Sequence, residues 1–320
     1  MTPSTSRLRQ LEPVKRMREK SSPSVHSGLP APGTPGGERT VAYLIEQFRA
    51  AGMEPGGENG GWTQTVPLIR TRIAPSATFA IRQAGHDVPL AFPGDIYVST
   101  VRPVESARIE DAPMVFVGYG VHAPERQWDD YQGVDLTGKV AVFLVNDPDF
   151  EAEPGSAVAG RFGGEAMTYY GRWSYKFEEA ARRGAVAALV VHETEAAGYG
   201  WNVIESPGGE NFNIVRGEDS LQPPLLQGWI RGPVAVELLR RAGHDFEAVK
   251  RRARTAGFRP IDLGATFSAD AAVEVERIES RNVIGRIAGS RAPGETVMFA
   301  AHWDSFGIGP PDEAGRRIRP

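Results

Sequence analysis

The triplet His302-Trp303-Asp304 combines the residue types in this chain that are best suited to metal chemistry. Imidazole is the commonest nitrogen ligand for zinc, and a carboxylate two residues away can accept the other ring N–H and fix the tautomer. The apolar run from Val297 to Ala301 predicts a buried strand that ends at His302, where α/β sheets place ligands and catalytic groups. Taken alone, the pattern favours a structural reading, in which a histidine at a strand end is capped by an aspartate.

Other sequence patterns that resemble binding or catalytic motifs lack the residues or the neighbouring elements that those motifs require. Residues Gly133 to Lys139 match G-x-x-x-x-G-K, but Val140 replaces the required Ser or Thr, and a strand is predicted where a phosphate-binding loop needs a helix. The chain has no G-x-S-x-G elbow and no cysteine, which excludes a thiolate zinc site and a cysteine nucleophile. The other histidines have no metal-spaced partner and are predicted to be surface or turn residues: His26, His86, His122, His192 and His244.

Composition indicates a folded chain. Because a domain typically has roughly 150 residues, a chain of 320 residues is expected to form about two domains. Hydrophobic residues make up 41% and charged residues 24%, which is ordinary for globular proteins. A net charge of −4 gives no basic field that would attract nucleic acid, and no apolar run approaches the roughly 18 residues of a membrane span. Residues 1–31 are basic and lack a signal peptide's apolar stretch, so we expect a disordered leader rather than a nucleic-acid-binding arm.

The apolar periodicity predicts where the main elements lie. Spacing of i, i+3, i+4, i+7 from Val41 to Phe48 predicts a helix over 38–51. Buried strands are predicted near 114–118, 139–145 and 186–191, with a short helix that stops at Gly184. Long strands are predicted from about 260 to 301, with the first helix packed on them. This order predicts an α/β fold in which residues of about 96–250 form a compact β-rich insert.

Three stretches, in the right order, resemble the M28 family of zinc aminopeptidases. SRNVIGRIAGS followed by ETVMFAAHWDSFG resembles the segment that carries the family's first metal ligand. Residues 114–150 and 166–193 resemble the protease-associated (PA) domain that many members contain, and residues 32–68 resemble the opening helix and strand. The resemblance implies a truncated zinc-exopeptidase-type mixed sheet with helices, plus an inserted β-rich PA domain. The peptidase part would comprise residues 32–95 and 256–320, and the PA insert residues 96–255.

The resemblance also implies an activity. Family members hold two zinc ions that activate a water and release N-terminal residues from peptides with a free N-terminus. In this family pattern His302 is a metal ligand and Asp304 is the carboxylate that orients it. The remaining ligands and the glutamate base of the family have no counterpart before Pro320, and Asp312 and Glu313 match none of the expected motifs.

We therefore expect an N-terminal piece of a zinc aminopeptidase that is inactive as it stands and does not hold zinc stably. The alternative is a non-catalytic module that binds a peptide or protein through the PA domain and retains no zinc. The family usually works outside the cytoplasm, whereas the sequence predicts no signal peptide, so the location is left open.

Overall fold

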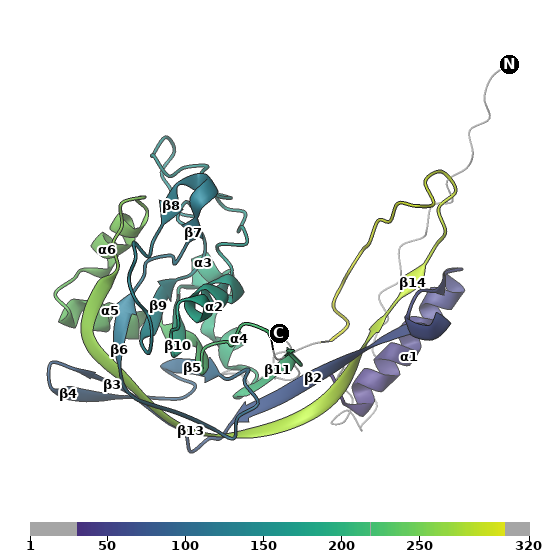
Figure 1. Cartoon of the computed structure of the whole chain (residues 1–320), viewed down its shortest axis with the longest axis horizontal. Coiled ribbons are helices and arrows are strands. Elements are labelled where there is room, and N and C mark those ends of the chain that lie inside the picture. Colours follow the sequence, from purple (N-terminus) through teal and green to yellow (C-terminus); the bar gives the residue numbers. More distant parts are fainter. Residues whose placement is uncertain (1–30, 218, 305–320) are drawn as a thin grey trace, which may run out of the picture.

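The computed structural model describes residues 31–217 and 219–304 of the chain. Most of them form a compact mixed sheet with helices, from which a long curved ribbon of two strands leads to the first helix (Figure 1). The predicted leader lies, apart from Ala31, outside the described residues, as do Asp312 and Glu313. No helix within the described ranges is long and apolar enough to cross a membrane.

The central sheet has ten strands, with eight in the order β11-β2-β13-β6-β9-β10-β12-β5 and two more, β3 and β4, added beside β13. Strands β6, β9, β10 and β12 are mutually parallel, and the remaining pairings are antiparallel. The strands are β2 (Thr63–Ile73), β3 (Thr78–Gln83), β4 (His86–Leu90), β5 (Ile96–Ser99), β6 (Ser106–Phe116), β9 (Val140–Leu144), β10 (Ala187–His192), β11 (Glu210–Ile214), β12 (Leu226–Arg231) and β13 (Ile261–Val283). The strands predicted near 114–118, 139–145 and 186–191 are thus confirmed.

Helices cover both faces of the parallel strands. Along β9, Val140 and Val142 face a core that includes residues of α5 and α6, whereas Ala141 and Phe143 face a second core that includes residues of α2. Every residue of β9 and β10 is buried, as a parallel strand covered on both faces requires. The helices are α1 (Pro35–Ala50), α2 (Trp173–Arg182), α3 (Thr194–Ala197), α4 (Trp201–Glu205), α5 (Gly232–Arg241) and α6 (Phe246–Ala253).

Short elements complete the connections. Strands β7 and β8 pair with one another beside a single turn of helix, η3, and strands β1 and β14 pair near the first helix. Their bounds are β1 (Glu54–Pro55), η2 (Glu58–Gly60), β7 (His122–Ala123), η3 (Pro124–Arg126), β8 (Trp128–Asp129) and β14 (Gly285–Arg286).

Strand β13 connects the compact sheet to the first helix. Its first half pairs with β3 and β6, and its second half pairs with β2 from Val273 to Val283. The core around β9 also takes in Phe79 of β3, Leu90 of β4 and Phe267 of β13. The compact unit therefore extends beyond residues 96–255, and a division of the chain at those two boundaries stays a prediction.

Helix α1 confirms the helix predicted over 38–51, although it begins three residues earlier. Thr34 caps it by accepting a hydrogen bond from the Gly37 amide, and Pro35 takes the first turn, where no amide hydrogen is needed. The helix contacts β13, as predicted, and Glu38 forms an ion pair with Arg281 at 2.8 Å.

The strand predicted for residues 297–301 is wrong. No strand follows β14 in the described part of the chain, and Val297, Met298 and Phe299 are 82%, 81% and 95% exposed. The residues after β14 run as an irregular loop (Figure 1). The physical reason is that a strand exists through hydrogen bonds to a neighbouring strand, and the described residues offer this segment no such neighbour.

Candidate functional site

The predicted contact between His302 and Asp304 is confirmed. Nδ1 of His302 lies 3.0 Å from Oδ1 of Asp304, within hydrogen-bond distance. The His302 side chain is 93% exposed, so the pair lies at the surface rather than at the end of a sheet strand, where the sequence placed it. An imidazole that donates through Nδ1 keeps the lone pair of Nε2 available for a proton or a metal ion.

Trp303 fixes the backbone between the two residues. Its indole Nε1 donates to the carbonyl oxygen of Arg281 at 2.9 Å, which anchors the loop to the end of β13. The ring also covers the first turn of α1, because a Cβ atom on Gly37 would lie 3.3 Å from it. The sequence analysis did not assign Trp303 a role, and its signal was its position inside the His-x-Asp triplet.

The described residues do not fit a pair of zinc ions. Within residues 31–217 and 219–304, no three His, Cys, Asp or Glu side chains gather closely enough to hold a metal ion. Zinc sites in proteins use three or four protein ligands. His302 supplies one ligand, whereas Asp304 is hydrogen-bonded to the Nδ1 side of that imidazole. The other ligands that the resemblance implies are therefore not provided by this part of the molecule.

A partly buried ion cluster, with Lys250 as its buried member, lies where β9 and β10 end. Nζ of Lys250 in α6 lies 2.7 Å from Glu151 and also contacts Glu193, while Arg254 pairs with Glu151. Burial lowers the pKa of Lys250, but hydrogen bonds to Glu151 and Glu193 outweigh it and raise the pKa above its ordinary value. Because the cluster holds two cations and two carboxylates, its charges balance, and it fastens α6 to the sheet edge. Sequence analysis missed it, since its members are scattered over about a hundred residues.

Lys176 of α2 holds a second buried centre together. Its ammonium is fully buried and donates to the carbonyl oxygens of Tyr119 at 2.6 Å, Asn146 at 3.1 Å and Tyr170 at 3.3 Å. Burial lowers the pKa of Lys176 to about 8 against the opposing pull of nearby carboxylates. The ammonium group thus links three loops by donating a hydrogen bond to one carbonyl oxygen of each.

Asp130 is one of two buried carboxyl groups that act on Lys176, the other being Asp147. It is buried and accepts hydrogen bonds from the Val121 amide at 2.9 Å and from the Trp128 indole at 2.7 Å. Burial raises the pKa of Asp130 to about 7, although both hydrogen bonds and Lys176 act in the opposite direction. Both carboxyl oxygens are engaged by groups of the fold itself, so we interpret this centre as structural.

An exposed aromatic patch precedes and begins α2. It consists of Met167, Tyr169 and Trp173, which are 38%, 53% and 45% exposed. The Tyr169 hydroxyl donates to Glu178 at 2.7 Å, and its ring packs edge-on against Tyr175 at 5.4 Å. These contacts hold the Tyr169 ring in place, although about half of this residue is exposed.

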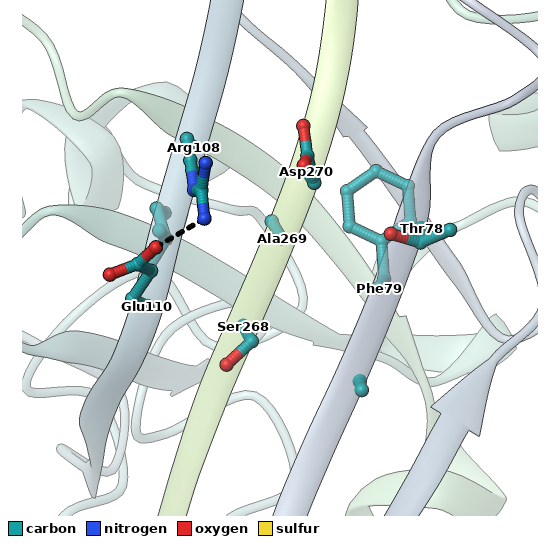
Figure 2. Close-up of a pocket in the computed structure, with 9 residues that line it drawn as sticks. Thr78, Phe79, Arg108, Glu110, Ser268, Ala269 and Asp270 are labelled. Atoms are coloured by element: carbon teal, nitrogen blue, oxygen red, sulfur yellow. Dashed lines mark ion pairs between the residues drawn. The ribbon is translucent and has the colours of Figure 1, made fainter.

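A shallow depression on the sheet surface has neither the size nor the residues of a ligand-binding or catalytic site. Figure 2 shows it between β3, β13 and β6, with Phe79 on one side and the ion pair of Arg108 and Glu110 on the other. Its volume of about 190 Å³ is below the roughly 300 Å³ at which small-molecule sites begin. Asp270 and Ser268 line it as well, without a nucleophile and base in contact.

Comparison with known proteins adds little to this description. No protein-family model matches the chain, and no curated protein matches it significantly. Among solved structures, the chain is similar to an aminopeptidase from Aneurinibacillus sp. strain AM-1, with 18% identity, a TM-score of 0.35 and coverage of 80% of this chain and 43% of the other. It is also similar to BSAP, a zinc aminopeptidase from Bacillus subtilis, with 15% identity, a TM-score of 0.27 and coverage of 80% and 42%.

The chain thus spans about two fifths of the length of these solved aminopeptidases. Neither likeness is close enough to assign this chain a family or an activity. What the fold and the site define is a mixed α/β protein with an exposed pair of His302 and Asp304.

Proposed function

We propose that this chain belongs to a zinc metallopeptidase of the aminopeptidase type and that His302 is one of its metal ligands. The observation that carries the proposal is the 3.0 Å hydrogen bond from His302 to Asp304, which leaves Nε2 open to solvent. The order of sequence stretches that resemble zinc aminopeptidases supports it independently. The substrates would be peptides with a free N-terminus.

The roles of the local residues follow from their contacts. Asp304 holds the imidazole in the tautomer whose Nε2 can accept a metal ion, and Trp303 holds the backbone against β13 and α1. The described residues add no further ligand, so zinc at His302 would lack the three or four donors of a catalytic site unless other residues supply them. We propose in addition that the compact unit around residues 96–255 is a PA-type insert.

Zinc titration of the whole chain tests the proposal. We expect weak zinc binding that His302→Ala removes, and no hydrolysis of leucine amide substrates with or without added zinc. His86→Ala is a matched control, because His86 is also exposed but has no place in the proposed site. Zinc affinity that is the same in His302→Ala and wild type would contradict the proposal, whereas zinc-dependent hydrolysis lost in His302→Ala would confirm it and refute the expected inactivity.

The aromatic patch of Met167, Tyr169 and Trp173 favours a second candidate function, a non-catalytic surface that binds peptides. Aromatic side chains offer large contact area at little cost in conformational entropy. Titration with extended peptides should then perturb Trp173, and Trp173→Ala should reduce affinity while Tyr43→Ala, an exposed aromatic on α1, should not. Equal affinity in both variants would remove the support for this candidate.

A further inference from the structure

Residues 145–172 join β9 to α2 without a helix or a strand. Loops of this length are uncommon in compact folds, and lids over binding sites are among those that occur. We refer to residues 152–170 as the strap. All of the strap is described, and Val158 is the one buried residue within it. A segment with so few buried side chains is expected to open while the rest of the fold stays intact.

Two carboxylates that follow β9 hold the strap. Asp147 accepts hydrogen bonds from the Thr168 amide at 2.6 Å and from the Thr168 hydroxyl at 2.8 Å. Asp149 accepts a hydrogen bond from the Phe162 amide at 2.8 Å. Asp147 and Asp149 are only 0% and 3% exposed, and these donors all belong to the strap. The strap therefore helps to bury both carboxylates.

Further contacts join the strap to α2 and to η3. Lys176 of α2 donates to the Tyr170 carbonyl at 3.3 Å, which is the longest of its three hydrogen bonds to carbonyl oxygens. The guanidinium of Arg126, in η3, lies over the rings of Phe162 and Tyr170, at 5.1 and 5.6 Å from their centroids. These contacts do not belong to the hydrogen-bond ladder of a helix or a sheet. Release of the strap can therefore leave β9 and α2 whole.

Burial of the charged groups opposes the closed position of the strap. Burial raises the pKa of Asp147 despite the hydrogen bonds from Thr168, and it lowers the pKa of Lys176 to about 8. In both cases the folded environment disfavours the charged form. In addition, Oδ1 of Asp149 is buried and has no hydrogen-bond partner among the described residues. Water that reaches these groups in an open state would offset part of the hydrogen bonding that is lost.

We propose that the strap is a lid, which opens as one unit by local unfolding and uncovers Asp147 and Asp149. These carboxylates lie just beyond the end of β9, and the ligands of α/β sheets bind outside the carboxyl ends of parallel strands. The closed strap blocks access to this edge of the sheet. The open strap admits a ligand and frees both carboxylates to accept hydrogen bonds from it. This inference goes beyond the proposed function and requires no zinc.

Hydrogen exchange of the full chain, followed by NMR under native conditions, tests the inference. The Phe162 and Thr168 amides donate to different carboxylates, so one opening of the whole strap should give them equal protection after correction for their intrinsic rates. We expect both amides to exchange about 100-fold or more faster than the amides of β9 and β10, because local opening is easier than global unfolding. Protection as high as in β9, or protection that differs more than about tenfold between the two amides, would overturn the inference.

Two threonine variants separate local opening from global unfolding. Thr168→Val removes the hydroxyl that donates to Asp147, and exchange of the Phe162 amide should then rise about tenfold or more. Thr71→Val is the matched control, because it removes a buried hydroxyl of β2 that donates to the Thr100 carbonyl at 2.6 Å, outside the strap. It should speed exchange in β9 and leave the Phe162 and Thr168 amides unchanged, since opening of the strap does not break that bond.

Each variant has an outcome that contradicts the lid. If the Phe162 amide exchanges at the wild-type rate in Thr168→Val, the strap does not open as one unit. Equal acceleration of the strap and of β9 in Thr71→Val would mean that the strap opens only when the whole protein unfolds. Zinc titration of His302→Ala measures the proposed function separately, so either proposal can fail without the other.

Discussion

Nδ1 of His302 and Oδ1 of Asp304 lie 3.0 Å apart on a loop outside the helices and strands, with the imidazole almost fully exposed. The contact is therefore local to the His-x-Asp triplet. It orients the imidazole before any metal arrives, which is the function that carboxylates have behind zinc-bound histidines.

Asp304→Asn should lower the zinc affinity of the chain by about tenfold or more, because loss of an outer-shell carboxylate commonly costs that much. The amide keeps the shape of the side chain but loses the negative charge that makes the imidazole more basic. Calorimetric titration measures the change, with Glu279→Gln as a control for the loss of one exposed carboxylate near the same end of β13. An affinity equal to wild type would show that Asp304 does not support the metal ligand.

Lys176→Met should destabilise the fold by about 2–5 kcal/mol. The variant removes the donor to three buried carbonyl oxygens and leaves them without their ammonium, and each such loss is costly. Urea denaturation measures the difference, and Arg172→Met, at an exposed position beside the same helix, should change stability little. A Lys176→Met protein as stable as wild type would show that the three loops are held by other contacts.

Asp130 should make stability depend on pH between about 4 and 7. Burial raises the pKa of Asp130 to about 7 from a model-peptide value of 3.8, so the folded protein holds this proton more tightly than the unfolded chain. The stabilisation is complete below about pH 4 and is lost as the pH rises through about 7. It amounts to a few kcal/mol.

The comparison of wild type with Asp130→Asn isolates this effect. The variant lacks the titration and is less stable at all pH values, because its amide N–H₂ faces one of the two donors, Val121 or Trp128. We expect the difference in unfolding free energy between the two proteins to shrink as the pH rises from 4 to 7. A constant difference over that range would contradict the raised pKa of Asp130.

Lys250→Met should destabilise the protein by about 3–5 kcal/mol, because it leaves Glu151 and Glu193 facing one another without their shared cation. Adding Glu193→Gln should recover part of the loss, since one of the two negative charges is then removed. Thermal unfolding of the single and double variants measures the recovery. A double variant less stable than the single one would show that the two carboxylates do not repel across this site.

Much of the fold could be predicted because its signals are local. The stripe of Val41, Leu44, Ile45 and Phe48 predicts α1 by spacing alone, and the apolar runs of β9 and β10 predict strands buried on both faces. In contrast, the run from Val297 to Ala301 carries the same signal and forms no strand, because strand formation depends on a neighbour that periodicity does not reveal.

The buried polar centres could not be predicted for a related reason. Lys176 lies on a helix, where a lysine usually faces solvent. Its acceptors are backbone carbonyl oxygens that only the folded loops bring together. Any residue type offers such a carbonyl, so no motif marks it. The contact between His302 and Asp304 was predictable, since two residues of sequence separation suffice to form it.

The central claim is that His302 binds zinc through Nε2. Its most direct test is a nitrogen-15 NMR titration of the six histidine side chains with zinc. The claim predicts that the Nε2 resonance of His302 changes at the lowest zinc concentrations, while Nδ1 remains the protonated nitrogen beside Asp304. Zinc that perturbs other histidines first and leaves Nε2 of His302 unchanged would contradict it.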